Sequence, residues 1–148
     1  MLKDFFGFYN EHYLDKTVPY DRVTEMLKAL MEKGIGLAVC SNKIQNMTEK
    51  VCERFFPDTF TYVFGQNDKF PLKPDPECPL WIAEQFGAKP SEVIFVGDSG
   101  SDMKTGKNAG FTAVGVSWGF RPREELLGDG ADYIIDKAEE LLDIIEKV

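Results

Sequence analysis

Helix-like and strand-like stretches alternate along the chain. Between residues 21 and 33 the apolar side chains recur at intervals of three and four, the spacing of one buried helix face, and Gly34 ends the pattern. Residues 35–40, by contrast, form a short and almost wholly apolar run, as expected of a strand that is covered on both faces. The same alternation predicts further helices at 45–55, 78–86, 101–109 and 137–147, and further strands at 61–65, 93–97, 112–118 and 131–135.

This alternation predicts an α/β fold. Strands that follow one another through helices are joined by right-handed crossovers, which place them in a mainly parallel, Rossmann-like sheet with helices on both faces. In sheets of this kind, ligands bind beyond the carboxyl ends of the strands. The polar residues that directly follow each predicted strand are therefore the first candidates for functional residues.

Two predicted strands are followed directly by polar side chains. Ser41 and Asn42 come after the strand at 35–40, and Asp98 comes after the strand at 93–97, with Asp102 four residues further on. Each of these residues has an ordinary structural explanation, because Ser, Asn and Asp are good helix caps. Carboxylates at a strand end are also hard oxygen ligands, suited to a magnesium ion that bridges to a phosphate. The stretch GDSGSD therefore suits either a capped turn or a metal site.

A lysine lies between these two strands in the segment FPLKPDP. Lys73 precedes Pro74, and a residue before proline is held in an extended conformation. Taken alone, Lys73 would be interpreted as a solvated surface lysine. Together with a hydroxyl and two carboxylates it makes a set that can bind phosphate oxygens and a bridging cation. We therefore expect Ser41, Lys73 and Asp98 to surround one crevice.

Composition narrows the remaining classes of function. With 148 residues, of which 43% are hydrophobic, the chain suits one domain, and its net charge of −8 argues against nucleic acid or an anionic membrane as the main partner. The first residues carry scattered charges rather than the apolar core of a signal peptide. No apolar run approaches the roughly 20 residues needed to span a bilayer. These features predict a soluble, cytoplasmic protein.

Cysteine and histidine narrow the chemistry further. Cys40, Cys52 and Cys78 lack paired C-x-x-C spacing and lie in or beside apolar runs, which predicts buried thiols in a reducing compartment. The single histidine, His12, lies in an aromatic segment and is better explained as a packed residue than as a catalytic one. Mechanisms that need a Ser-His-Asp or Cys-His arrangement are therefore disfavoured.

The order of these motifs resembles that of the haloacid dehalogenase-like hydrolases. That family has a serine after a strand, then a lysine in a loop, then a G-D-S-x-x-D turn, in the order of Ser41, Lys73 and GDSGSD here. Within the family the chain looks most like the phosphoglycolate phosphatases, over 17–43, FPLKPDP and 115–135. The resemblance covers nearly the whole chain. It implies a magnesium-dependent phosphatase, a phosphoric monoester hydrolase that acts on a small phosphorylated metabolite.

The resemblance also implies a role for each matching residue. Ser41 and the Asn42 backbone would bind the transferring phosphoryl group, and Lys73 would neutralise the charge between that group and the nucleophile. Asp98 would ligate Mg²⁺. Asp102 would either support that ligand or orient the lysine.

The first motif of the family has no match in this chain. The family carries an aspartate nucleophile, and an acid-base aspartate two residues later, at the end of its first strand. No apolar strand followed by D-x-D precedes Ser41. We therefore expect a truncated core at 18–148, in which the family's first central strand is missing, and a remnant of the helical cap at 1–17. Four residues, Phe5, Phe6, Tyr9 and His12, would be the aromatic face of that remnant.

The missing strand would leave two buried strand edges without hydrogen-bond partners, which is costly. We expect direct pairing of the flanking strands or an invading segment, with a second copy of the chain, as a homodimer, as one source. Two function classes then stay open: a magnesium-dependent phosphatase whose nucleophile segment is absent here, and an inert relative that binds a phosphate ligand or a protein. A receiver-like signalling domain is a weaker third, because its acceptor aspartate is not seen. We expect the chain as given to be inactive.

Overall fold

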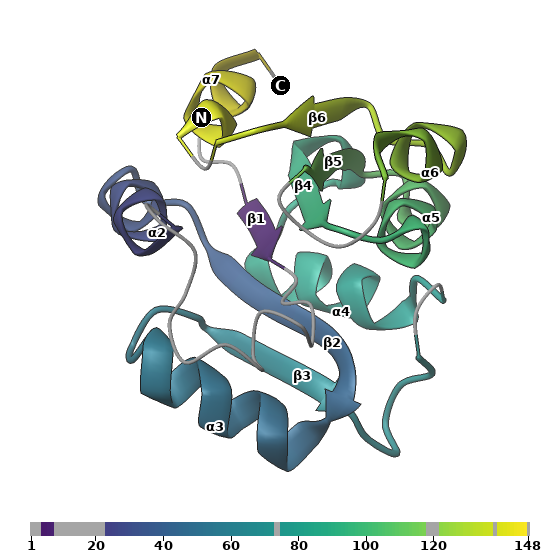
Figure 1. Ribbon diagram of the computed structural model, residues 1–148. Coiled ribbons are helices and arrows are strands. Elements are labelled where there is room, and N and C mark those ends of the chain that lie inside the picture. Colours follow the sequence, from purple (N-terminus) through teal and green to yellow (C-terminus); the bar gives the residue numbers. More distant parts are fainter. Residues whose placement is uncertain (1–3, 8–22, 73–74, 118–121, 138, 148) are drawn as a thin grey trace.

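The structure is built on one parallel sheet (Figure 1). The computed structural model describes residues 4–7, 23–72, 75–117, 122–137 and 139–147. Within these residues the sheet has six strands in the order β3-β2-β1-β4-β5-β6, and all neighbours pair in parallel. The strands are β1 (Asp4–Gly7), β2 (Leu37–Ile44), β3 (Tyr62–Gln66), β4 (Val93–Gly97), β5 (Thr112–Val116) and β6 (Tyr133–Ile135). The predicted α/β class is confirmed.

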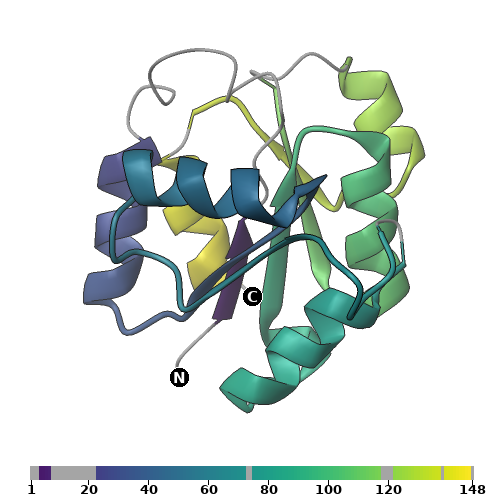
Figure 2. The same ribbon diagram turned by 90° about the horizontal axis from the view of Figure 1, so that it is seen from below.

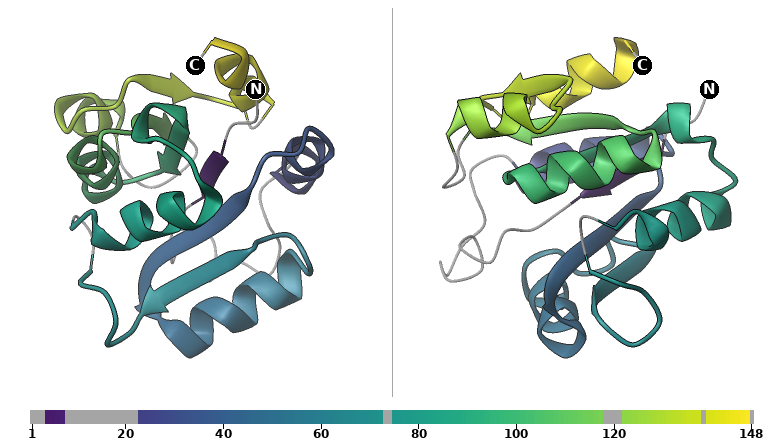
Figure 3. Two further views of the ribbon diagram at one scale, coloured as in Figure 1. Left: turned by 180° about the vertical axis from the view of Figure 1, so that it is seen from behind. Right: turned by 90° about the vertical axis from the view of Figure 1, so that its right-hand side faces the viewer.

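Helices cover both faces of this sheet, which is seen between them in Figure 2. One face carries α2 (Val23–Glu32), α3 (Gln45–Phe55) and α7 (Glu140–Lys147). The other carries α4 (Glu77–Phe86), α5 (Gly100–Ala109) and α6 (Arg123–Gly128), and the 3₁₀ turn η1 (Pro90–Glu92) leads into β4. Figure 3 shows the same two layers from behind and from the side. Among the described residues, no helix combines the length and the apolar character needed to cross a membrane.

Buried side chains on alternate faces of the central strands hold the helices in place. Ile94 packs with Leu30 of α2 and Leu141 of α7. Its neighbour in the chain, Phe95, packs on the other face with Ile82 of α4. Every residue of β4 is buried, as a strand covered on both faces requires. The apolar run at 93–97 was therefore a sound predictor of a central strand.

The N-terminal segment Asp4–Gly7 fills the centre of the sheet. Phe5 pairs with Leu37 of β2 on one side and with Ile94 of β4 on the other. The expectation that the edges of β2 and β4 would not be left open is thus confirmed, and the invading segment belongs to this same chain. The homodimer was expected because a second copy of the chain could have supplied the missing strand. It stays a prediction, but the sheet no longer requires it.

Two of the expectations for the N-terminus need correction. Phe5 and Phe6 are strand residues in the sheet, not part of a cap face, and the central position expected to lack a strand is occupied by β1. Pairing with two neighbours satisfies backbone groups on both edges, and this outweighs the weak local preference of the sequence for a strand. Tyr9 and His12, with the rest of the proposed cap remnant and its boundary at residue 17, lie outside the described residues.

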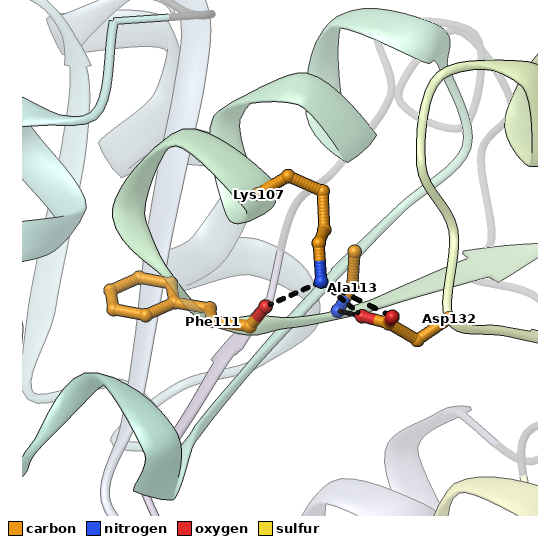
Figure 4. A network of polar contacts seen from close by, with 4 residues as sticks. All are labelled: Lys107, Phe111, Ala113 and Asp132. Atoms are coloured by element: carbon orange, nitrogen blue, oxygen red, sulfur yellow. Dashed lines mark hydrogen bonds and ion pairs between the residues drawn. The ribbon is translucent and has the colours of Figure 1, made fainter.

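A polar clip joins α5 to the C-terminal edge of the sheet (Figure 4). The carboxylate of Asp132 accepts hydrogen bonds from the Lys107 ammonium at 2.9 and 3.1 Å and from the Ala113 backbone N–H at 2.8 Å. Lys107 also donates to the carbonyl of Phe111 at 3.5 Å. The clip therefore fixes the start of β5 to the segment that leads into β6.

Replacing Asp132 by alanine is expected to lower the free energy of unfolding by about 1–2 kcal/mol. An exposed ion pair contributes up to ~1 kcal/mol and a backbone hydrogen bond about as much again. The measurement is urea unfolding followed by circular dichroism. Asp68→Ala, at an exposed loop position, is the matched control and should change stability by less than ~0.5 kcal/mol. Equal effects of the two substitutions would show that the clip adds no stability.

Candidate functional site

Ser41 and Asp98 lie on either side of β1. Gly7 pairs with Val39 of β2 and with Val96 of β4. Ser41 is the second residue after Val39, and Asp98 is the second residue after Val96. Neighbouring strands of a sheet are ~4.8 Å apart, so β2 and β4 are separated by about 10 Å at this point. The two predicted site residues therefore flank the carboxyl end of β1 at matching positions.

Ser41 and Asn42, which follow the apolar part of β2, belong to the strand itself. β2 continues through Ser41 and Asn42 to Ile44, and its pairing with β3 is irregular between Cys40 and Ile44. Helix α3 begins after Ile44, its N-cap residue, whose side chain makes no capping hydrogen bond. Neither Ser41 nor Asn42 is therefore the N-cap residue of that helix.

Gln45 holds this irregular strand end in place. Its amide nitrogen donates to the carbonyl of Val63 at 2.8 Å, and its amide oxygen accepts from the N–H of Gly65 at 2.6 Å. The side chain thus takes the place of a backbone partner for β3 where the ladder is broken. Sequence reasoning did not single out Gln45, because only the register of β2 against β3 gives it this role.

A pocket lies beside the carboxyl end of β2. Ser41 and Asn42 line it, and Ser41 is only 6% exposed. On the other side it is lined by the loop after β3, including Leu72 and Asp75. Lys73, the third predicted member of the crevice, lies outside the described residues. Asp98 is not one of the residues that line it.

The loop that forms the far wall is fixed by its own polar and aromatic contacts. The Asn67 side-chain oxygen accepts from the N–H groups of Lys69 and Phe70, at 2.8 and 3.1 Å, and its nitrogen donates to the carbonyl of Gly65 at 2.7 Å. The Lys69 ammonium lies 3.9 Å from the centre of the Trp81 ring, a cation–π contact that ties the loop to α4. The loop that forms this wall of the pocket is therefore held in place by specific contacts.

Asp98 and Asp102 differ in what surrounds their carboxylates. Both are buried, with exposed fractions of 1% and 0%. One oxygen of Asp102, Oδ2, accepts hydrogen bonds from the N–H of Asp98 and the N–H of Ser99, each at 3.2 Å, and from the Ser99 hydroxyl at 2.9 Å. The Ser99 oxygen in turn accepts from the N–H of Asp102, which completes a capping box at the start of α5. Asp102 therefore folds the turn that carries Asp98.

Glu125 adds a contact that the sequence did not single out. Its carboxylate accepts from the N–H of Gly100 at 3.0 Å, in the first turn of α5. The helix that carries Glu125, α6, was itself not predicted. The turn after β4 is thus held by hydrogen bonds to two carboxylates, that of Asp102 in α5 and that of Glu125 in α6.

The described residues fit a magnesium ion in the type of ligand that they offer, but not in the number of ligands. Asp98 offers a buried carboxylate, the hard oxygen ligand that this ion prefers. The described residues contain no group of three or more His, Cys, Asp or Glu that could hold a metal ion. Since Oδ2 of Asp102 is engaged by three donors, Asp98 is the better suited of the two predicted ligands, and Asp102 is placed to support it.

Comparisons with known proteins identify the family of this chain. The family model of the haloacid dehalogenase-like hydrolases matches residues 1–116. The chain is 31% identical to the N-acetylmuramic acid 6-phosphate phosphatase of Pseudomonas aeruginosa, over 99% of this chain and 66% of that protein. It is 34% identical to a phosphoglycolate phosphatase of Vibrio vulnificus, over 85% of this chain and 56% of that protein. The chain thus spans between half and two thirds of the length of these relatives.

Solved structures give the same result. A crystal structure assigned as a phosphoglycolate phosphatase, from Lactobacillus delbrueckii subsp. bulgaricus, superposes with a TM-score of 0.81 and 31% identity, over 86% of this chain and 54% of that one. A hydrolase of the same superfamily from Geobacter sulfurreducens superposes with a TM-score of 0.70 and 29% identity, over 84% of this chain and 55% of that one. Sequence and fold agree, and the chain belongs to the haloacid dehalogenase-like hydrolase family.

Proposed function

We propose that this chain carries the phosphate-binding and metal-supporting part of a magnesium-dependent phosphatase of the phosphoglycolate phosphatase-like type. The observation that carries the proposal is the matching position of Ser41 and Asp98 on the two sides of β1. A phosphoryl group between them would have hydroxyl and backbone donors on one side and a cation-binding carboxylate on the other.

Each group has a distinct task in this proposal. The hydroxyl of Ser41 and the backbone N–H of Asn42 bind phosphoryl oxygens, and Lys73 neutralises their charge as the phosphoryl group transfers. Asp98 holds the cation, and Asp102 positions Asp98 through the N–H bonds of the turn. Bound magnesium supplies positive charge that polarises the phosphoryl oxygens.

The substrate class is a small phosphomonoester, and no single compound is assigned. The two curated relatives named above carry different substrates in their names, N-acetylmuramic acid 6-phosphate and phosphoglycolate. Both are small phosphorylated metabolites, and neither resembles a nucleic acid or a membrane surface. We place the reaction in the cytoplasm, where the composition of the chain predicts the protein to be.

An inert, phosphate-binding relative is the second candidate function. One observation favours it for the chain as given: the central strand of the sheet is present, yet the residues that follow β1 in the sequence are Phe8, Tyr9 and Asn10. Phosphoryl transfer through an aspartyl-phosphate needs a carboxylate nucleophile, and none of these three residues has one. Ligand binding without hydrolysis is the behaviour that this sequence supports.

Binding of inorganic phosphate in the presence of magnesium tests the site without relying on turnover. Calorimetric titration should show saturable binding that Ser41→Ala and Lys73→Ala each weaken by about 10-fold or more, because each loses a charge-assisted hydrogen bond. Asp98→Asn should remove the magnesium dependence of phosphate binding.

Two exposed positions away from the pocket provide matched controls for these variants. Ser91→Ala and Lys50→Ala change the same residue types and should leave the affinity unchanged. Phosphate binding that none of the site variants weakens would overturn the proposed site. The absence of any phosphate binding by the unaltered chain would leave a protein-binding role as the better account.

A further inference from the structure

Two of the three cysteines meet beside the pocket. The sulfur atoms of Cys40 and Cys78 are 3.5 Å apart, although the residues are 38 positions apart in the chain. Cys40 is in β2, directly before Ser41, and Cys78 is in the first turn of α4. Both are buried, with exposed fractions of 3% and 7%, and both contribute to the lining of the pocket. A small oxidant that enters the pocket would therefore reach them.

The two sulfur atoms are in contact but not bonded. A disulfide bond is about 2.05 Å long, so the two sulfur atoms would have to approach by roughly 1.5 Å. Cys40 lies in β2 and pairs with Phe64 of the neighbouring strand β3, whereas Cys78 lies in the first turn of helix α4. The N-terminal turn of α4 is the part that would move, towards a β2 that stays in place.

A purely structural role would explain the burial of both thiols, because cysteine packs well as a small apolar residue. It does not account for the contact of their sulfur atoms in the lining of a pocket. Cys52 shows the contrast. It lies in α3, is 5% exposed and does not line this pocket, and burial raises the pKa of its thiol to about 12. A thiol of that kind stays protonated near neutral pH and is a poor nucleophile.

We propose that Cys40 and Cys78 form an oxidation site that closes to an intramolecular disulfide when a peroxide enters the pocket. The first sulfur attacks the peroxide, takes one oxygen as a sulfenic acid and releases one water. The second sulfur then attacks the sulfenic sulfur, which forms the S–S bond and releases a second water. Two thiols lose two electrons and two protons in total, and one hydrogen peroxide is reduced to two waters. Thiol reductants reverse the step through a mixed disulfide.

The disulfide would tie α4 to β2 immediately before Ser41. This inference goes beyond the proposed function and does not depend on it, because the oxidation chemistry requires neither phosphate nor magnesium. Its test therefore measures thiols and cross-links instead of turnover, and it can fail while phosphate binding succeeds, or the reverse.

The experiment treats the full chain with stoichiometric hydrogen peroxide, quenches it with acid, and alkylates the remaining thiols after denaturation. Intact mass should show one alkylated thiol after oxidation and three after treatment with dithiothreitol, since the chain has three cysteines. The oxidised protein should be about 2 Da lighter before alkylation, because a disulfide lacks two hydrogens. Trypsin separates the three cysteines into different peptides, and the peptides with Cys40 and Cys78 should be found linked.

Variants identify the pair. Cys52→Ala should still form the disulfide and retain no alkylatable thiol after oxidation, whereas Cys78→Ala should form no internal cross-link. Should Cys78→Ala fail to fold, the peptide map of Cys52→Ala decides alone. Three alkylatable thiols after oxidation of the unaltered chain would overturn the proposal. A cross-link through Cys52, or oxidation of single sulfurs without an S–S bond, would overturn it as well.

Discussion

Replacing Tyr9 and Glu11 together by aspartate is expected to convert an inactive chain into a magnesium-dependent phosphatase. The unaltered chain should release phosphate from small phosphomonoesters no faster than background, because no carboxylate nucleophile follows β1 in the sequence. Position 9 is the second residue after Gly7, just as Ser41 and Asp98 are the second residues after the strand residues that pair with Gly7. The double variant therefore creates a D-x-D motif whose first aspartate is the second residue after Gly7.

The gain should be large, since acid-base catalysis by a positioned carboxylate alone contributes on the order of 100-fold or more. The measurement is release of inorganic phosphate from a panel of small phosphomonoesters, including phosphoglycolate, with and without magnesium. Adding Asp98→Asn or Lys73→Ala to the double variant should abolish the gain. Tyr9→Asn with Glu11→Gln is the matched control, because amides replace the carboxylates at similar size and should give no turnover.

Two results would contradict this account. Robust turnover by the unaltered chain, abolished by Asp98→Asn, would mean that another residue is the nucleophile. A well-folded double variant that stays at background would mean that the end of β1 does not serve as the nucleophile position in this chain. Circular dichroism of each variant separates the second result from a failure to fold.

Periodicity was a reliable guide to most of the sheet. The apolar run at 93–97 matches β4 residue for residue, and the residues beyond it and beyond the strand at 35–40 led to Asp98 and Ser41. Such runs are informative because a strand covered by helices on both faces must be apolar on both faces. The positions of ligand-binding residues follow from the topology rather than from any one residue type.

The N-terminal strand could not be predicted in the same way. Asp4–Gly7 begins with aspartate and ends with glycine, which are both depleted in strands. Its conformation is imposed by the open edges of β2 and β4, so the signal lies in residues more than thirty positions away. Helix α6 escaped prediction for a related reason, since its six residues are too few to show a helical period.

The site raised a different difficulty. The sequence gives Asp102 two explanations, a helix cap and a metal ligand, and both residue type and spacing suit either one. The hydrogen bonds to Oδ2 show that Asp102 shapes the turn, and its role as a metal ligand stays a prediction. Likewise, neither the role of Gln45 at the break in the ladder nor the contact of Cys40 with Cys78 follows from spacing, because each joins segments that meet only in the folded chain.

Replacing Asp102 by alanine is expected to destabilise the protein by about 3 kcal/mol. The substitution removes the acceptor for three donors, including two backbone N–H groups of a buried turn, and it removes one half of the capping box of α5. Asp102→Asn keeps one oxygen acceptor at similar volume and should cost only about half as much. Lys104→Ala in the same helix, at an exposed ion pair of 3.7 Å, is the control and should cost less than ~0.5 kcal/mol.

Gly97 provides a test of whether the Asp102 side chain itself fills this turn. A Cβ atom at position 97 would come closer to the side chain of Asp102 than packed atoms allow, so Gly97→Ala should cost about 1–3 kcal/mol in the unaltered protein. Alanine at position 102 would keep the nearest obstructing atom, Cβ, so the partner variant is Asp102→Gly. In that background the obstruction is gone, and Gly97→Ala should cost much less, because adjacent sites are energetically coupled. Urea unfolding of the four proteins gives the coupling energy directly. Additive costs, or a loss below ~1 kcal/mol for Asp102→Ala, would mean that Asp102 does not hold the turn that presents Asp98.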